Sequence, residues 1–417
     1  MTNQRILATF LILTTSIIST PAADWPEFRG PTGQGLAGDD KLPQVWTAEK
    51  NVAWKQSIPG KGWSSPVIVD GKVYLTTAVP QVSGTNTDQK LEALCLDASN
   101  GKILWETPIL VQDGAKAPRI HGKNSHASPT PIVSGKRVYV HFGHAGTACL
   151  TLDGDIIWKN TDLNYSPVHG NGGSPVLVDD LLIFSSDGSD KQFIVALESV
   201  TGKVKWQTER KTTAAKKFSF NTPLVITVKD QKQVISAGSD VVCAFDPANG
   251  KEIWRVRYEG YSVIPRPVYA KGLVFVSSSY DTPTLLAIRP DGSGDVTDSH
   301  VAWTTKEGAP KTPSPLVVGD ELYMVSDDGK VSCRDAKTGD LHWSKQVRGH
   351  FSASPLAAGG KIYLQSEEGV GFVLAAGKEF NKLAENDLGE RSLASYAAVG
   401  GALFIRTEKQ LFRIEEK

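Results

Sequence analysis

Histidines are unevenly distributed along this chain, and five of the eight fall between positions 121 and 169. His121, His126 and His169 lie in polar loop sequence together with Asn124 and Asn171. Imidazole and amide groups in such loops can hold a metal, an anion or a polar ligand. Their spacing matches no zinc motif. Loop histidines that satisfy local hydrogen bonds are therefore the simpler interpretation, and a ligand site is the alternative.

Arg266 interrupts a series of small residues. Phrases in which a small residue precedes Pro recur along the chain, as in Ser65-Pro66 and Ser314-Pro315. Aligned on these phrases, the position before the anchor is Ser65, Pro129, Ser174, Thr222, Arg266, Ser314, Ser354 and Ser395. An ion pair with a nearby carboxylate is the favoured explanation for Arg266, and a bound anion is the alternative. If a ligand site exists, we expect it at the histidines and asparagines above, with Arg266 nearby.

Other patterns that would indicate catalysis are missing from the sequence. It contains no Gly-x-Ser-x-Gly, His-Glu-x-x-His or Cys-x-x-Cys-His motif and no phosphate loop, so we assign no catalytic residue and no metal ligand. Each of the four cysteines precedes an Asp by two to four residues, at a similar point of a repeat: Cys95, Cys149, Cys243 and Cys333. Equivalent positions in different repeats lie too far apart to bond. We therefore expect buried free thiols rather than disulfides or metal ligands.

Composition and the N-terminus limit the class of protein. The 417 residues include 45 Lys plus Arg and 45 Asp plus Glu, so the positive field of a nucleic-acid binder is absent. Residues 1–23 are typical of a secretory signal peptide, with Arg5 before an apolar core from Ile6 to Ile18. No apolar run is long enough to span a bilayer, and no Cys directly follows the core. We expect an exported monomer, periplasmic or extracellular, with no transmembrane segment and no lipid anchor.

Seven of the ten tryptophans form a regular ladder. The gaps between them are 51, 53, 48, 48, 49 and 40 residues, for Trp54, Trp105, Trp158, Trp206, Trp254, Trp303 and Trp343. A turn phrase, Asp-x-x-x-Gly, precedes several of them, as at 97–101 and 246–250, and alternating apolar residues flank it. Four short antiparallel strands per repeat describe a propeller blade. The tryptophans are interpreted as packing residues between blades.

The ends of the chain are predicted to close the ring. Eight opening phrases accompany seven ladder tryptophans, and the C-terminal strands within 394–414 lack a tryptophan strand after them. The segment Asn51 to Gln56, which carries Trp54, can supply that strand and leave no open edge. The prediction is an all-β, eight-bladed β-propeller over residues 51–417, preceded by an N-terminal extension over 24–50.

The repeat resembles that of the quinoprotein-type (PQQ-like) eight-bladed propellers, over about Asn51 to Lys417. The segment Asp24-Trp-Pro-Glu-Phe-Arg-Gly-Pro-Thr-Gly, with Gly62-Trp-Ser-Ser-Pro66, is similar to exported PQQ-binding-like β-propeller repeat proteins, and the BamB-like family is also related. In the quinoprotein alcohol dehydrogenases, the family pattern includes two adjacent cysteines beside the cofactor and carboxylates around Ca²⁺. No two cysteines are adjacent here, so we expect neither PQQ nor another cofactor.

Two functions follow from these observations. The first is a non-catalytic exported propeller that acts as a binding or scaffold module for a protein or cell-envelope partner. The alternative is a small-ligand or metal/quinone-dependent enzyme that uses the His-rich channel mouth of blades two and three. Copurification from an envelope extract, together with elemental analysis, separates them.

Overall fold

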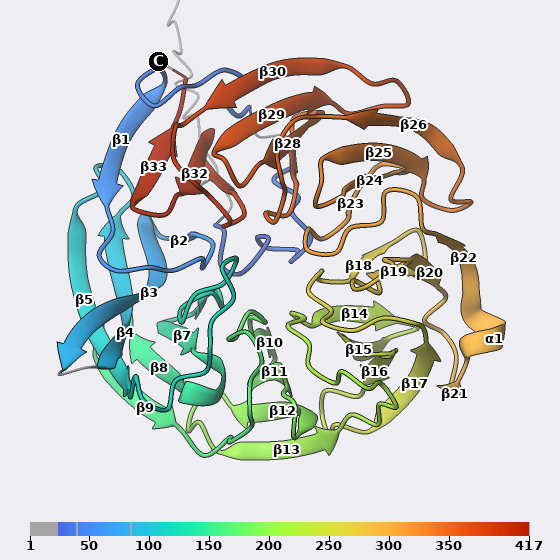
Figure 1. Cartoon of the computed structure of the whole chain (residues 1–417), viewed down its shortest axis with the longest axis horizontal. Coiled ribbons are helices and arrows are strands. Elements are labelled where there is room, and N and C mark those ends of the chain that lie inside the picture. Colours follow the sequence, from blue (N-terminus) through green and yellow to red (C-terminus); the bar gives the residue numbers. More distant parts are fainter. Residues whose placement is uncertain (1–23, 39–40, 84–85, 417) are drawn as a thin grey trace, which may run out of the picture.

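Eight sheets surround a central axis in the computed structural model, which describes residues 24–38, 41–83 and 86–416 (Figure 1). Neighbouring strands within each blade are antiparallel, and consecutive blades follow one another around the ring. The predicted eight-bladed propeller is confirmed. The predicted signal peptide lies outside the described residues.

The first four blades are formed by consecutive strands. Blade 1 contains β2 (Val67–Val69), β3 (Lys72–Ser83), β4 (Asn86–Asp97) and β5 (Ile103–Gln112). Blade 2 contains β6 (Ile132–Ser134), β7 (Arg137–His141), β8 (Thr147–Thr151) and β9 (Ile156–Asn160), with the short 3₁₀ helix η1 (Gly143–Ala145). Blade 3 contains β10 (Val176–Val178), β11 (Leu181–Asp187), β12 (Gln192–Glu198) and β13 (Val204–Glu209). Blade 4 contains β14 (Leu224–Val228), β15 (Gln231–Gly238), β16 (Val241–Phe245) and β17 (Glu252–Arg257).

The remaining blades complete the ring. Blade 5 contains β18 (Val268–Ala270), β19 (Leu273–Ser277), β20 (Leu285–Ile288) and β22 (Val301–Thr305). Blade 6 contains β23 (Leu316–Val318), β24 (Glu321–Val325), β25 (Lys330–Asp335) and β26 (Leu341–Gln346). Blade 7 contains β27 (Leu356–Ala358), β28 (Lys361–Gln365), β29 (Val370–Ala375) and β30 (Lys382–Asp387). Blade 8 contains β31 (Ala397–Val399), β32 (Ala402–Arg406) and β33 (Gln410–Ile414).

The N-terminal strand β1 (Val52–Ser57) is the fourth strand of blade 8. It pairs antiparallel with β33, and Trp54 lies opposite Arg413. The predicted closure across the termini is therefore confirmed.

Ladder tryptophans pack on the turn of the following blade, which explains why the turn phrase and the tryptophan recur together. Trp206 of blade 3 donates its indole N–H to the carbonyl of Pro247 in blade 4 at 2.8 Å. Gly250 lies beneath the ring with a φ of +72°, and a Cβ at Gly250 would come within 2.4 Å of Trp206. Four others make the equivalent bond to the next blade at 3.0 Å, namely Trp54, Trp105, Trp158 and Trp343.

The junction between blades 4 and 5 is built differently. The blade 5 turn is enlarged and contains β21 (Gly294–Asp295) and the helix α1 (Thr297–His300); β21 pairs in parallel with β17 as a fifth strand of that sheet. Trp254 instead donates to Gln233 Oε1 of its own blade at 2.9 Å. Gln233 Nε2 in turn donates to the Pro290 carbonyl of blade 5 at 3.2 Å. Gln233 thus links Trp254 to the longer turn of blade 5 through two hydrogen bonds.

The interface between blades 7 and 8 takes its large aromatic residue from the N-terminal extension. Leu383 occupies the ladder position of blade 7, and Trp46 is completely buried nearby. The Trp46 ring stacks on Tyr363 and meets Tyr396 edge-on, both at a centroid distance of 6.5 Å. The extension is therefore packed into the propeller.

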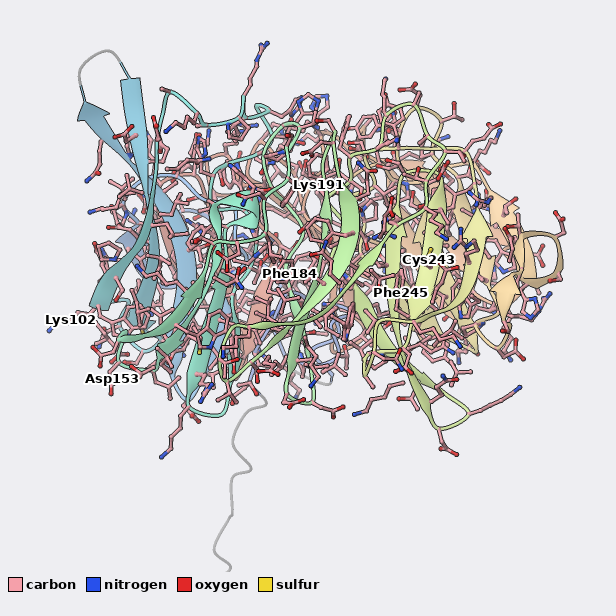
Figure 2. All side chains as sticks on the ribbon, turned by 90° about the horizontal axis from the view of Figure 1, so that it is seen from below. Lys102, Asp153, Phe184, Lys191, Cys243 and Phe245 are labelled. Atoms are coloured by element: carbon pink, nitrogen blue, oxygen red, sulfur yellow. The ribbon has the colours of Figure 1, made fainter. Side chains whose placement is uncertain are left out.

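The hydrophobic core lies between adjacent blades, because each cluster of buried apolar residues combines neighbouring sheets. All four cysteines are buried and free, and they fall in blades 1, 2, 4 and 6 as predicted. Cys243 and Phe245 lie well inside the molecule in side view (Figure 2).

The two faces of the ring differ. Lys191 lies on the side that we call the mouth face, where chain segments pass from one blade to the next, and Lys102 and Asp153 lie towards the opposite, turn face (Figure 2). The long hairpin of β3 and β4 projects beyond the ring on the mouth face (Figure 2). None of the helices in the described ranges has the length and apolar character that crossing a membrane requires.

Candidate functional site

A cavity of about 300 Å³ opens at the mouth face on the propeller axis. Most of its walls come from the segments that precede the innermost strands, and every blade contributes to them; Tyr280 comes from the loop after β19. Phe28 of the N-terminal extension also lines the cavity. The site is thus assembled from residues that closure of the ring brings together.

Seven hydroxyl side chains form a ring around this cavity. We call Ser65, Thr130, Ser174, Thr222, Ser314, Ser354 and Ser395 the hydroxyl ring; each lies two residues before an innermost strand, and all line the cavity. At seven of the eight junctions, a backbone N–H donates to the hydroxyl oxygen of the next blade at 2.9 to 3.2 Å. The alignment that placed Pro129 in this series is wrong, because Thr130, followed by Pro131, makes the bonds.

Arg266 occupies the eighth position and bridges the junction that lacks a hydroxyl. Its Nε donates to the Pro223 carbonyl of blade 4 at 3.0 Å. Its Nη2 lies 3.2 Å from Glu27 Oε1, and its Nη1 donates to the Phe28 carbonyl at 2.6 Å. The ion-pair interpretation of Arg266 is confirmed, and the carboxylate comes from the N-terminal extension.

Residues 24–38 of that extension form a plug across the centre of the ring, visible as the blue segment inside the blades (Figure 1). The plug pairs with innermost strands: Trp25 and Ile68 exchange backbone bonds in blade 1, and Ala37 donates to Ala357 in blade 7. Gly33 has a φ of +65°, and a Cβ there would come within 2.6 Å of the Arg266 guanidinium. The plug backbone is thus fitted closely around Arg266.

Aromatic rings line one side of the mouth. The aromatic arc consists of His121, His169, Phe218, Tyr261 and Tyr280, with successive centroids 5.5 to 6.1 Å apart. Lys216 Nζ lies 4.1 Å from the Tyr261 ring centroid, and Lys311 Nζ lies 5.2 Å from that of Tyr280. The arc therefore offers apolar ring surface together with positive charge.

Three of the predicted site residues do meet at this mouth. The His121 N–H donates to the His169 carbonyl at 3.2 Å, and Asn124 Nδ2 donates to the same carbonyl at 2.9 Å. All three line the cavity. Partial desolvation at the mouth lowers the pKa of His169, although its side chain is exposed, and the neighbouring His121 and Arg119 lower it further. At neutral pH, His169 therefore presents an uncharged imidazole.

The other predicted residues lie elsewhere. Asn171 is buried and bonds His144 Nδ1, the Phe142 carbonyl and the Tyr165 hydroxyl. Burial lowers the pKa of His126, and nearby His144 lowers it further. Asn171 thus belongs to an interior polar group of blades 2 and 3, and the half-buried His126 lies near the His144 of that group. Arg266 bonds the plug. None of the three is part of the cavity lining.

Sequence reasoning did not find the aromatic part of the site. Phe218, Phe220, Tyr261 and Tyr280 line the cavity, and each lies in a segment on the mouth face that carries no recognised motif. Phe218 and Phe220 stand a few residues before an opening phrase, as His126 and His169 do, so their distance to the anchor could have indicated them.

The cavity does not fit the quinone cofactor suggested by the fold. Its lining, which consists entirely of described residues, includes no cysteine and no carboxylate side chain. Nor do three or more His, Cys, Asp or Glu side chains gather around a possible metal position anywhere in the described ranges. What the cavity offers is hydroxyl groups, imidazoles, Lys123 and aromatic rings.

Comparison with known proteins identifies the family. The model of the family described as outer membrane protein assembly factor BamB matches residues 51–222, 190–314 and 295–409, which together cover nearly all of the propeller. The chain belongs to the BamB family. A BamB of Bordetella pertussis is 23% identical over 376 residues, which cover 84% of this chain and 86% of that protein.

The chain is also similar to quinone-dependent dehydrogenases. The chain is 23% identical over 295 residues to the alcohol dehydrogenase (quinone), dehydrogenase subunit, of Gluconobacter oxydans, which covers 65% of this chain but 34% of that protein. BamB of Moraxella catarrhalis superposes with a TM-score of 0.63 at 13% identity, covering 88% of this chain and 97% of that one. Quinohemoprotein alcohol dehydrogenase of Comamonas testosteroni superposes with a TM-score of 0.67 at 12% identity, covering 94% of this chain and 81% of that one. At these identities the structures show the shared fold alone.

Proposed function

We propose that this BamB-family propeller is an exported, non-catalytic binding module that docks a protein partner of the cell envelope on its mouth face. The aromatic arc carries the proposal. Aromatic side chains with polar or charged neighbours are enriched where proteins bind one another, because they bury a large area at a small cost in side-chain entropy. The half-buried Phe218 and Tyr261, with Lys216 beside them, provide such an anchor.

The family supports this reading, since its members are described as assembly factors of outer membrane proteins. By analogy, the partner is a component of envelope assembly. The projecting hairpin of β3 and β4 lies on the same face and would extend the contact surface. The proposal assigns the cavity no cofactor.

The experiment is copurification from an envelope extract. Wild type is compared with the double variant Phe218→Ser/Tyr261→Ser and with the matched control Val204→Ser/Leu341→Ser, which changes exposed apolar side chains on the outer strands β13 and β26. We expect wild type and the control to retain one partner at equal yield. The yield of that partner with the arc variant should be at least tenfold lower. Equal retention by all three, or no partner with wild type, would contradict the proposal.

A further inference from the structure

Most hydroxyls of the hydroxyl ring have an O–H donor without an acceptor in the part of the chain that the structure describes. A serine or threonine hydroxyl has one O–H donor and two acceptor lone pairs. In the ring, the oxygens are already used as acceptors for backbone N–H groups, so their own protons are available for another partner. Ser354 donates to the Ser314 oxygen at 3.0 Å, but the other six find no acceptor among the described residues. Because the ring lines the cavity, six O–H donors surround one axial space.

Positive charge is concentrated around the same ring. Arg29 donates to the carbonyl of Pro315, directly after Ser314, at 2.8 Å, and Arg406 donates to the Ser64 carbonyl, directly before Ser65, at 3.2 Å. With Arg266, three guanidinium groups at most 2% exposed adjoin the ring. Glu27 is the one carboxylate that pairs with any of them in the described structure.

Of the three guanidinium groups, that of Arg29 has the fewest hydrogen-bond partners. Its Nε and Nη1 atoms are buried and have no hydrogen-bond partner among the described residues. Burial lowers the pKa of Arg29 to about 9, and the charge of Arg266 acts in the same direction. The group therefore stays charged at neutral pH in an environment that disfavours an unpaired cation. A negative charge nearby would relieve this cost.

We propose that the hydroxyl ring binds an oxyanion, a carboxylate or phosphate group carried by a small aromatic or apolar body. The O–H donors would point at the oxyanion, and the buried arginines would supply its countercharge. The lining itself contains no carboxylate; Glu367 and Asp327 lie behind it, where they bond the lining residues Lys123 and Thr312. The cavity of about 300 Å³ limits the ligand to a small one, and Phe218, Phe220 and Tyr261 would contact its body. This goes beyond the proposed function, because it rests on the axial ring and holds with or without a protein partner.

The test is calorimetric titration of the purified full chain with three probes of similar size: phenyl phosphate, phenylacetate and the neutral 2-phenylacetamide. We expect at least one anion to bind tenfold or more tightly than the amide, and the tighter anion identifies the head group as phosphate or carboxylate. No anion binding, or equal affinity for the amide, overturns the proposal. Because no partner protein is involved, the result is independent of the copurification.

Ring variants locate the site. Ser174→Ala/Ser395→Ala removes two of the six free O–H donors and should weaken anion binding at least tenfold. Ser366→Ala is the matched control, because its buried hydroxyl accepts the Val370 N–H at 3.2 Å and is not part of the cavity lining. Retained affinity in a folded double variant overturns the assignment to the ring. If that variant fails to fold, the comparison of anion and amide on wild type still decides the proposal.

Discussion

At the scale of single residues, His141 should make stability depend on pH. It is 2% exposed, its Nδ1 lies 2.8 Å from Thr147 Oγ1, and its ring lies 4.2 Å from that of Phe184. Burial lowers the pKa of His141 to about 3, and His144 adds to the effect. Between about pH 6.5 and 3 the unfolded chain therefore binds a proton that the folded chain excludes, so stability is complete above this range and falls as the pH decreases.

We expect this histidine to contribute a loss of about 2 kcal/mol in the free energy of unfolding between pH 7 and pH 5. Urea denaturation at both pH values measures it. In His141→Gln that part of the pH dependence should disappear, whereas the exposed His121→Gln should behave as wild type. An unchanged pH dependence in His141→Gln would show that His141 is not the group responsible.

Two predicted site groups should respond differently to substitution. Asn171→Ala removes buried hydrogen bonds to the Tyr165 hydroxyl, His144 and the Phe142 carbonyl, and should cost about 1 to 3 kcal/mol. His169→Ala changes an exposed side chain at the cavity and should stay within about 0.5 kcal/mol of wild type. Urea unfolding of both variants checks this, and a similar loss in both would mean that the mouth is structural too.

At the scale of elements, the contact between tryptophan and turn should account for the stability of the blade junctions. Gly250→Ala introduces a Cβ at positive φ and places it 2.4 Å from the Trp206 ring. Gly272→Ala has an equally positive φ of +76° but no atom within 4 Å. The control Gly272→Ala should therefore lower the free energy of unfolding by about 1 to 2 kcal/mol, because a residue with a Cβ disfavours this positive φ. Gly250→Ala should lower it by about 1 to 3 kcal/mol more, because of the contact with the ring. Equal losses in chemical denaturation would contradict a role for the ring contact.

The elements were predictable because their pattern is local and repeated. Turn phrase and tryptophan recur in every well-matched blade, so sequence alone indicated both the strands and the closing strand at Trp54. The sequence Ser128-Pro129-Thr130-Pro131 offers two equivalent anchors. Only the bonds that Thr130 exchanges with neighbouring blades decide between them.

The site was less predictable because its residues are distant in sequence. Phe218, Tyr261 and Tyr280 come from segments that carry no shared motif, and they converge once the ring is closed. The histidine cluster was visible, but only His121 and His169 line the cavity, and His126 does not. The partner of Arg266 is Glu27, some 240 residues away, and no local pattern links them.

At the scale of the whole molecule, the residues before blade 1 serve two structural purposes. The plug bonds innermost strands of blades 1 and 7, and its Glu27 and Phe28 bond Arg266 of blade 5. Strand β1 closes blade 8, and its Trp54 packs on the turn of blade 1. Because β1 comes from the N-terminal side and the other three strands of blade 8 from the C-terminus, its pairing with β33 joins the two ends of the ring.

Two deletions should separate these purposes. Removing residues 24–38 takes away the plug but leaves the ring closed, so we expect a folded protein with a lower thermal midpoint. Removing residues 24–57 also takes away the completely buried Trp46 and strand β1. This exposes β33 as an edge and removes the Trp54 contact with Gly101. That step should cost several kcal/mol more, since loss of one buried tryptophan alone costs about 3 to 5 kcal/mol. Thermal unfolding of both deletions, with Trp54→Ala in the intact chain, checks the order. If the longer deletion melted at the same temperature as the shorter one, β1 would not be the strand that holds the ring closed.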